Sequence, residues 1–231
     1  MKKRIMAWIL AACAAFSLTG LPATAAETDS PATTTDAPAA ESVGAVENPF
    51  TDVNADSPFL PGILYAVENG ITKGTTPSTF SPYSLCTRAQ IIAFLWRAWG
   101  SPEPTIENPF DDVKPEAYYY KAALWSYEKG LVGGTSFDAY SYCTRLEVVT
   151  YLWKLSDAPE SYEAHKDAFP FTDIGDDADA LNAIAWASMD EAITNGTTET
   201  TFSPAKRCTR AQIVTFIYRA RNLFETSDGQ A

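Results

Sequence analysis

Histidine and cationic side chains are scarce in this 231-residue sequence. It has one histidine, and 17 Lys and Arg residues stand against 29 Asp and Glu residues, so the formal net charge is −12. Catalytic or metal sites that depend on several histidines are therefore poorly supported. A nucleic-acid partner is not expected, because phosphate binding needs clustered Lys and Arg. The acidity is typical of a soluble chain on an extracellular surface.

Long apolar runs are missing after the N-terminus. Residues 1–26 combine three basic residues, an apolar stretch and a small-residue site at 23–26, which is the pattern of a signal peptide. No later segment reaches the roughly 18 to 20 apolar residues that a membrane-spanning helix needs. We therefore expect a secreted chain on the cell wall or cell surface with no transmembrane segment. The alternative is a lipoprotein acylated at Cys13, which ends a Leu-Ala-Ala-Cys segment.

Large apolar side chains are nearly absent from residues 27–48, which are mostly Ala, Thr, Pro and acidic residues. Such a composition cannot bury enough surface to fold, so we predict a disordered linker there. The sequence as a whole is 46% hydrophobic and 13% aromatic. That is enough apolar material for a globular core in the rest of the chain.

The remainder repeats itself with a period of about 60 residues. Each unit opens with Phe-x-Asp-Val or Phe-x-Asp-Ile, continues through an apolar stretch to a glycine-containing turn, and closes with an aromatic loop, Cys-Thr-Arg and a second apolar stretch. We divide the chain into three repeats and a short tail. These are residues 49–104, 105–166 and 167–223, followed by residues 224–231.

The closing phrase predicts where each second helix begins. A threonine is followed three residues later by Gln or Glu and then by an apolar run, which is a capping box. The pairs are Thr87 with Gln90, Thr144 with Glu147, and Thr209 with Gln212.

We expect these second helices at residues 87–99, 144–155 and 209–223. Their apolar residues cover most of the helix circumference, so the helices must be buried. One repeat cannot bury such a surface alone. The predicted fold is therefore all-α, with three helix-loop-helix repeats forming one pseudo-threefold bundle with three prongs.

The ordered phrases Phe-x-Asp-Val, Gly-Ile-x-x-Gly, Thr-Phe-Ser-Pro and Thr-Arg-Ala-Gln resemble the S-layer homology (SLH) repeat over residues 49–222. The resemblance implies a domain whose inter-repeat grooves bind a secondary cell-wall polysaccharide, often one with a pyruvate ketal. It implies non-covalent anchoring to the wall, or in some envelopes a link between an outer membrane and peptidoglycan. The alternative is a structural or assembly protein of the cell surface, whose repeats contact other proteins. We expect no enzymatic activity and no cofactor.

The resemblance places the ligand-contacting arginine at Arg88, Arg145 and Arg210. An arginine in a first helical turn offers a planar fork for a carboxylate, and free amides at the helix N-terminus would attract the same anion. Alternatively, these arginines are solvated or form ion pairs with aspartates of the Asp52 class. The predicted site also includes two further groups of equivalent residues, namely Gly74, Gly134 and Gly196, and Gln90, Glu147 and Gln212.

The turn glycines have two explanations, since they either bring backbone close to a sugar or permit a left-handed turn. The second repeat departs most from the pattern. It has three residues fewer between Gly134 and Phe137 than its neighbours have at this place, and it reads Thr-Arg-Leu-Glu. We therefore expect its groove to differ from the other two.

The third repeat carries one extra residue in its first helix. Trp186 stands seven residues before Ile193, whereas Trp125 stands six before Leu131. We expect a bulge or a register shift there.

Three of the four cysteines occupy equivalent positions, namely Cys86, Cys143 and Cys208. A three-thiolate metal site is conceivable. The simpler interpretation, which we prefer, is a small buried residue that packs before each helix cap, with no metal.

Two further features have a functional and a structural explanation each. The acidic residues between 173 and 179 suggest either calcium binding or a turn before a helix. Tyr118 to Tyr120 suggest either stacking on sugars or a helix start in the core.

Overall fold

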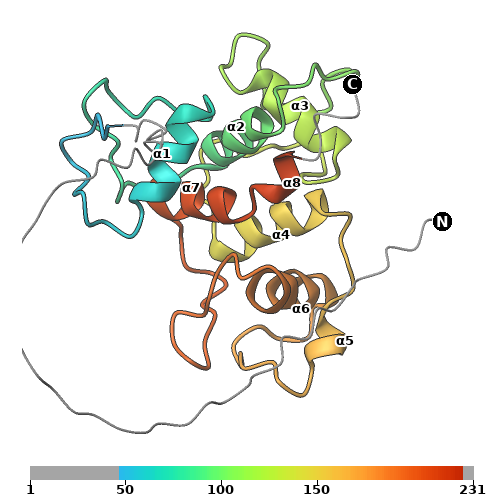
Figure 1. Ribbon diagram of the computed structural model, residues 1–231. Coiled ribbons are helices and arrows are strands. Elements are labelled where there is room, and N and C mark those ends of the chain that lie inside the picture. The colour runs from blue at the N-terminus through green and yellow to red at the C-terminus, as the bar shows by residue number, and fades with distance from the viewer. Residues whose placement is uncertain (1–46, 226–231) are drawn as a thin grey trace, which may run out of the picture. The chain divides into compact units, whose positions relative to one another are not determined.

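The computed structural model describes residues 47–225. The predicted signal peptide, Cys13 and nearly all of the predicted linker lie outside this range. Within it the chain forms helices and no strand, only isolated bridges, so the all-α prediction is confirmed (Figure 1). The helices are α1 (Leu60–Glu68), α2 (Arg88–Ala98), α3 (Tyr120–Glu128), α4 (Arg145–Leu155), α5 (Tyr162–His165), α6 (Ala178–Ala185), the π-helix η1 (Trp186–Asp190), α7 (Arg210–Arg219) and α8 (Asn222–Glu225).

All three predicted capping boxes are present, at the starts of α2, α4 and α7. In the first, the Gln90 amide donates to Thr87 Oγ1, and the Thr87 amide donates to Gln90 Oε1 at 3.0 Å. The predicted extent of the third helix was wrong. α7 ends at Arg219, and α8 begins separately at Asn222, a residue type of low helix propensity.

The extra residue of the third repeat is absorbed by η1, which confirms the predicted bulge. In η1 the Glu191 amide donates to the Trp186 carbonyl five residues earlier, at 3.0 Å. The wider turn takes up one residue. Trp186 and Ile193 therefore both stay buried, as Trp125 and Leu131 do in the second repeat.

The three equivalent cysteines form a closed ring of backbone hydrogen bonds. The Cys86 amide donates to the Cys208 carbonyl at 3.0 Å, Cys143 to Cys86 at 3.0 Å, and Cys208 to Cys143 at 2.9 Å. Their thiols are free and buried, and burial raises the pKa of Cys208 to about 11 and that of Cys86 to about 12. No group of ligand residues suited to a metal ion occurs within residues 47–225.

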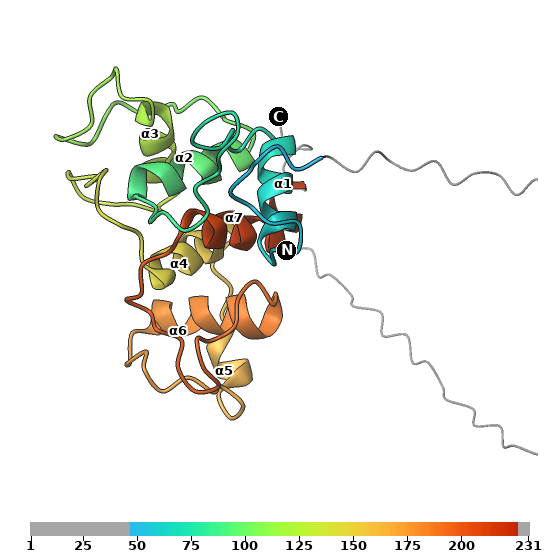
Figure 2. The same cartoon turned by 90° about the vertical axis from the view of Figure 1, so that its left-hand side faces the viewer.

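The helices pack in a cyclic order. α1 packs against α7, α3 against α2, and α6 against α4, so each first helix rests on the second helix of the preceding repeat. α2 also contacts α7. In both ribbon views α4 and α7 lie between the α2 and α3 pair and the α5 and α6 pair (Figures 1 and 2). Threefold symmetry of the whole bundle stays a prediction.

Ala192, just after η1, has a left-handed backbone conformation whose energetic cost can be tested. It has φ 50°, whereas Gly70 and Gly130 occupy the same place in the other repeats with φ 67° and 65°. A left-handed conformation disfavours any residue with a Cβ. Ala192→Gly should raise the free energy of unfolding by about 1 kcal/mol, measured by urea denaturation. Gly70→Ala, whose added Cβ would meet nothing within 4 Å, should lower it by a similar amount. An unchanged or lower stability of Ala192→Gly would contradict this account.

Candidate functional site

The N-termini of the second helices are covered by the next repeat. The Arg88 amide donates to the Ser141 carbonyl at 2.8 Å, and the Ala89 amide donates to the Ala139 carbonyl at 3.0 Å. The same two bonds recur at the other junctions, where α4 contacts the loop of the third repeat and α7 that of the first. The expectation of free helix amides facing an anion was therefore wrong. These amides hold neighbouring repeats together.

The aspartate of the opening phrase holds the aromatic loop of its own repeat. Asp52 accepts the amides of Phe80 and Ser81, both at 2.8 Å, and Asp112 and Asp173 accept the equivalent amides. The second loop residue has positive φ in all three repeats, so these bonds stabilise a strained turn. Within residues 47–225 no ion pair joins an Asp52-class aspartate to an arginine. That alternative was wrong.

Arg210 and Arg145 are buried between two repeats. Arg210 is 4% exposed and lies over the rings of Phe80 and Phe94, at 5.0 and 5.4 Å from their centroids. Its Nε donates to the Phe80 carbonyl at 3.1 Å, and Nη2 donates to the Thr72 hydroxyl. Arg145 is bound in the same way by the third repeat. Burial lowers the pKa of both guanidinium groups, and neither has an ion-pair partner in the described part of the chain.

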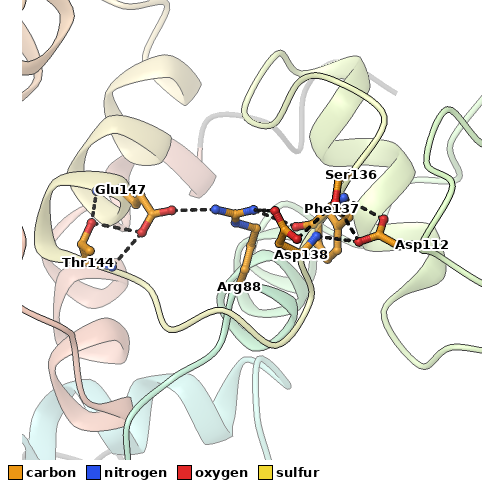
Figure 3. Close-up of polar contacts among 7 residues, drawn as sticks. All are labelled: Arg88, Asp112, Ser136, Phe137, Asp138, Thr144 and Glu147. Atoms are coloured by element: carbon orange, nitrogen blue, oxygen red, sulfur yellow. Dashed lines mark hydrogen bonds and ion pairs between the residues drawn. The ribbon is translucent and has the colours of Figure 1, made fainter.

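Arg88 is bound differently, because the second repeat replaces two of the partner residues. Val132 stands where Thr72 and Thr194 stand, and Glu147 stands where Gln90 and Gln212 stand. The Arg88 guanidinium therefore donates to the Phe137 carbonyl at 2.8 Å and to Glu147 Oε1 at 2.9 Å. Burial tends to lower the pKa of Arg88, but the hydrogen bond to Glu147 outweighs this effect and raises it. Figure 3 shows Arg88 between Glu147 and the segment that carries Asp138.

A groove of about 480 Å³ lies beside Arg88, and we call it the Arg88 groove. Its lining combines charged side chains with apolar ones, and it includes Arg88, Asp138, Glu147, Leu131, Val132 and Leu146. It contains residues of the first and second repeats, so it lies at their junction. The prediction that the second repeat has a different groove agrees with this geometry.

The shortened loop explains why this junction is open. In the first repeat the extra residues form a tight turn in which the Thr75 amide donates to the Thr79 carbonyl at 2.8 Å, and the third repeat has the same turn. The second repeat lacks these residues. A Cβ added at Gly133 or Gly134 would meet nothing within 4 Å, so the space is unoccupied there.

The predicted glycines therefore have different surroundings. A Cβ on Gly74 would lie 2.6 Å from the Phe50 ring and from the Thr79 carbonyl, and Gly196 is equally crowded by Phe171 and its own loop. Both glycines are therefore crowded by the protein itself, and Gly196 also lines a cavity of about 260 Å³ together with Phe171 and Asn195. Gly134 has φ 81°, and its neighbour Gly133 lines the Arg88 groove.

Residues of the groove that the sequence did not reveal include Asp138, Ser136 and Tyr151. Aligning the three repeats would have revealed Asp138, because it replaces a serine at the equivalent positions 81 and 203. Gln90 and Gln212 serve as caps, whereas Glu147 both caps α4 and binds Arg88.

The remaining candidate features are placed as follows. Asp177 caps α6 by accepting the Ala180 amide, which agrees with the turn and helix start. Tyr119 is buried and stacks on Phe137, whereas Tyr118 is exposed.

The comparison with known families decides the identity of the repeats. Residues 49–92, 109–148 and 170–214, more than half of the chain, match the family model for the S-layer homology domain. The chain belongs to the S-layer homology family. Membership associates this SLH protein with the cell surface and the cell wall. Within the described residues, no helix combines the length and apolar character needed to cross a membrane.

One curated relative is named "Endoglucanase" and comes from Bacillus sp. (strain KSM-635). It is 30% identical over 174 residues, which are 71% of this SLH protein and 18% of the relative. The chain thus spans less than a fifth of that protein's length.

The buried arginine at the junction of the third and first repeats should be essential for stability. Arg210→Ala removes the contacts with two rings and leaves the Phe80 carbonyl without its partner. It should lower the free energy of unfolding by about 3 kcal/mol, measured by urea denaturation. Arg207→Ala, at an exposed arginine 4.9 Å from the Tyr142 ring, should lower it by less than about 1 kcal/mol. Equal losses in the two variants would show that the junction does not depend on Arg210.

The Asp112 bonds predict a pH dependence. Desolvation tends to raise the pKa of Asp112, but the hydrogen bonds from the amides of Phe137 and Asp138 lower it below its ordinary value. A carboxylate whose pKa is lower in the folded state stabilises the fold at pH values above its unfolded-state pKa of about 4. This stabilisation is lost as the pH falls and the carboxylate is protonated. Asp112→Asn should therefore be about 1 kcal/mol less stable than the wild type at pH 7. The difference should shrink below about pH 4; a difference that is constant with pH would contradict the assignment. Asp111→Asn, at the exposed neighbour, is the control.

Proposed function

We propose that this SLH protein anchors itself non-covalently to the bacterial cell wall by binding a secondary cell-wall polysaccharide in its inter-repeat grooves. The observation that carries the proposal is the Arg88 groove. Its lining combines hydrogen-bonding groups with apolar side chains at a junction of two SLH repeats. Pockets that bind small molecules combine these two kinds of lining and have volumes of about 300 to 1,000 Å³.

The same proposal includes an anionic group on the polysaccharide, such as a pyruvate ketal. Arg145 and Arg210 support it, because a desolvated guanidinium without a carboxylate partner gains from an approaching anion. Both arginines donate from Nε and Nη2, and their Nη1 atoms form no hydrogen bond within the described residues. The Arg88 charge, in contrast, is already balanced by Glu147.

We propose a binding role and no catalytic activity for this chain. The match covers only 18% of the endoglucanase, so the activity in that protein's name is not assigned to this chain. An assembly role is the second candidate. It is favoured by the exposed aromatic side chains at the ends of the aromatic loops, where Tyr83 and Tyr140 are 75% and 81% exposed.

A steric block of the Arg88 groove tests the proposal. Gly133 lines the groove, its φ is not in the left-handed region, and it has open space around its Cβ position. Gly133→Trp should therefore fill the groove and leave the core intact. In a pulldown on cell-wall sacculi, the wild-type chain should bind, and Gly133→Trp should bind at least about tenfold more weakly.

The controls separate the candidates. Glu107→Trp adds the same side chain at an exposed position outside the groove and should bind as the wild type does. Stripping the non-peptidoglycan polysaccharide from the sacculi should abolish binding. Retention on stripped sacculi would assign the ligand to peptidoglycan, and no binding to intact walls would favour the assembly role. Arg145→Gln and Arg210→Gln variants, checked for folding by circular dichroism, should also weaken binding.

A further inference from the structure

Two carboxylates distinguish the Arg88 groove from the other two junctions. Asp138 replaces the serines at positions 81 and 203, and Glu147 replaces the glutamines at positions 90 and 212. Each change adds one negative charge to a junction that has the same single arginine. The electrostatic character of this groove is therefore the opposite of that at the junctions of Arg145 and Arg210.

Arg88 is shared by two carboxylates, and Asp138 keeps one oxygen that accepts no hydrogen bond within the described residues. The Glu147 Oε1 atom accepts from Arg88 at 2.9 Å, and Oε2 accepts from the Thr144 amide at 2.8 Å. Asp138 Oδ1 accepts from the Ser136 hydroxyl at 3.1 Å. Its Oδ2 forms an ion pair with Arg88 Nη1 at 3.8 Å, which is beyond hydrogen-bond distance, and accepts no hydrogen bond within the described residues. The side chain of Asp138 is 59% exposed.

Two carboxylates thus face one arginine, so the groove keeps an excess negative charge, and Asp138 Oδ2 still has room for a hydrogen-bond donor. Asp112 adds to the negative potential, because it lies behind the same loop and also accepts from Ser136. An anionic sugar would be repelled here. A cation with N–H donors would gain a charge-assisted hydrogen bond.

The rest of the lining suits a sugar ring better than a bare ion. Leu131, Val132 and Leu146 form an apolar surface, and Ser136 and Thr150 supply hydroxyl groups. Leu146 stands where the other repeats have alanine, so the apolar surface is larger here. No set of three ligand residues for a metal ion occurs in the described range.

We propose that the Arg88 groove binds an amino sugar whose nitrogen carries no acetyl group, with the protonated amine on Asp138 Oδ2. Acetylation of the nitrogen would remove the charge that Asp138 recognises. This inference rests on the proposed function, since it names the kind of sugar that one of the grooves accepts. The polysaccharide would then present its cationic residue to this groove and its anionic group to the junctions of Arg145 or Arg210.

The test compares two trisaccharides that differ only in N-acetylation, a glucosamine trimer and an N-acetylglucosamine trimer. Binding to the purified chain is measured by calorimetry at pH 6, where the amines are protonated. The glucosamine trimer should bind about tenfold more tightly. Asp138→Asn keeps an acceptor for Ser136 and tolerates the φ of 53°. It should reduce binding of the glucosamine trimer to the level of the acetylated one.

Asp111→Asn is the matched control, because it removes the same charge from an exposed neighbour outside the groove; it should keep the preference. Equal binding of the two trimers, no binding of either, or a preference that survives in Asp138→Asn would overturn the inference. Tighter binding of a lysine-containing tripeptide would overturn it as well, by assigning the groove to peptide amines. The sacculus pulldown is run on the same samples. If the wild-type chain binds intact walls but does not prefer the glucosamine trimer, this inference alone is rejected. If the wild-type chain does not bind intact walls, the proposed function is rejected.

Discussion

The backbone hydrogen bonds that join Cys86, Cys143 and Cys208 in a ring bring the starts of the three second helices together. Each helix then begins directly beneath the aromatic loop of the next repeat, and its first two amides are satisfied by carbonyls of that loop. The arginine at the first helical position necessarily enters the next repeat. No repeat can supply these partners for itself, so the domain depends on closure of the ring.

This constraint also explains how the three junctions can differ without a change of fold. The amide contacts are made by the backbone, so they tolerate substitutions in the side chains around the arginine. In the second repeat a shorter loop occurs together with several such substitutions, among them Val132 for threonine, Asp138 for serine and Glu147 for glutamine. Together they produce the open Arg88 groove, in which carboxylates balance the charge of the arginine. At the other two junctions, which lack these changes, the arginine is buried against phenyl rings.

Features that depend on local sequence could be predicted. The capping boxes follow from a threonine and a Gln or Glu three residues apart, and a bulge or register shift follows from one extra residue between Trp186 and Ile193, where the structure has the π-helix. The partners of the helix amides could not be predicted, because they are carbonyl groups, which every residue has. Likewise, Arg88 and Glu147 are 59 residues apart in sequence, and only the ring of repeats brings them together. The end of α7 was missed because its apolar pattern continues beyond the break at Ala220.

The central claim is that the Arg88 groove is where this SLH protein contacts wall glycan. Amide chemical-shift mapping by NMR, with polysaccharide released from sacculi added to the labelled chain, tests it most directly. The account predicts that the largest shifts occur at Gly133, Ser136, Asp138 and Leu146. Shifts confined to the exposed loop ends around Tyr83 and Tyr140, with none in the groove, would contradict it.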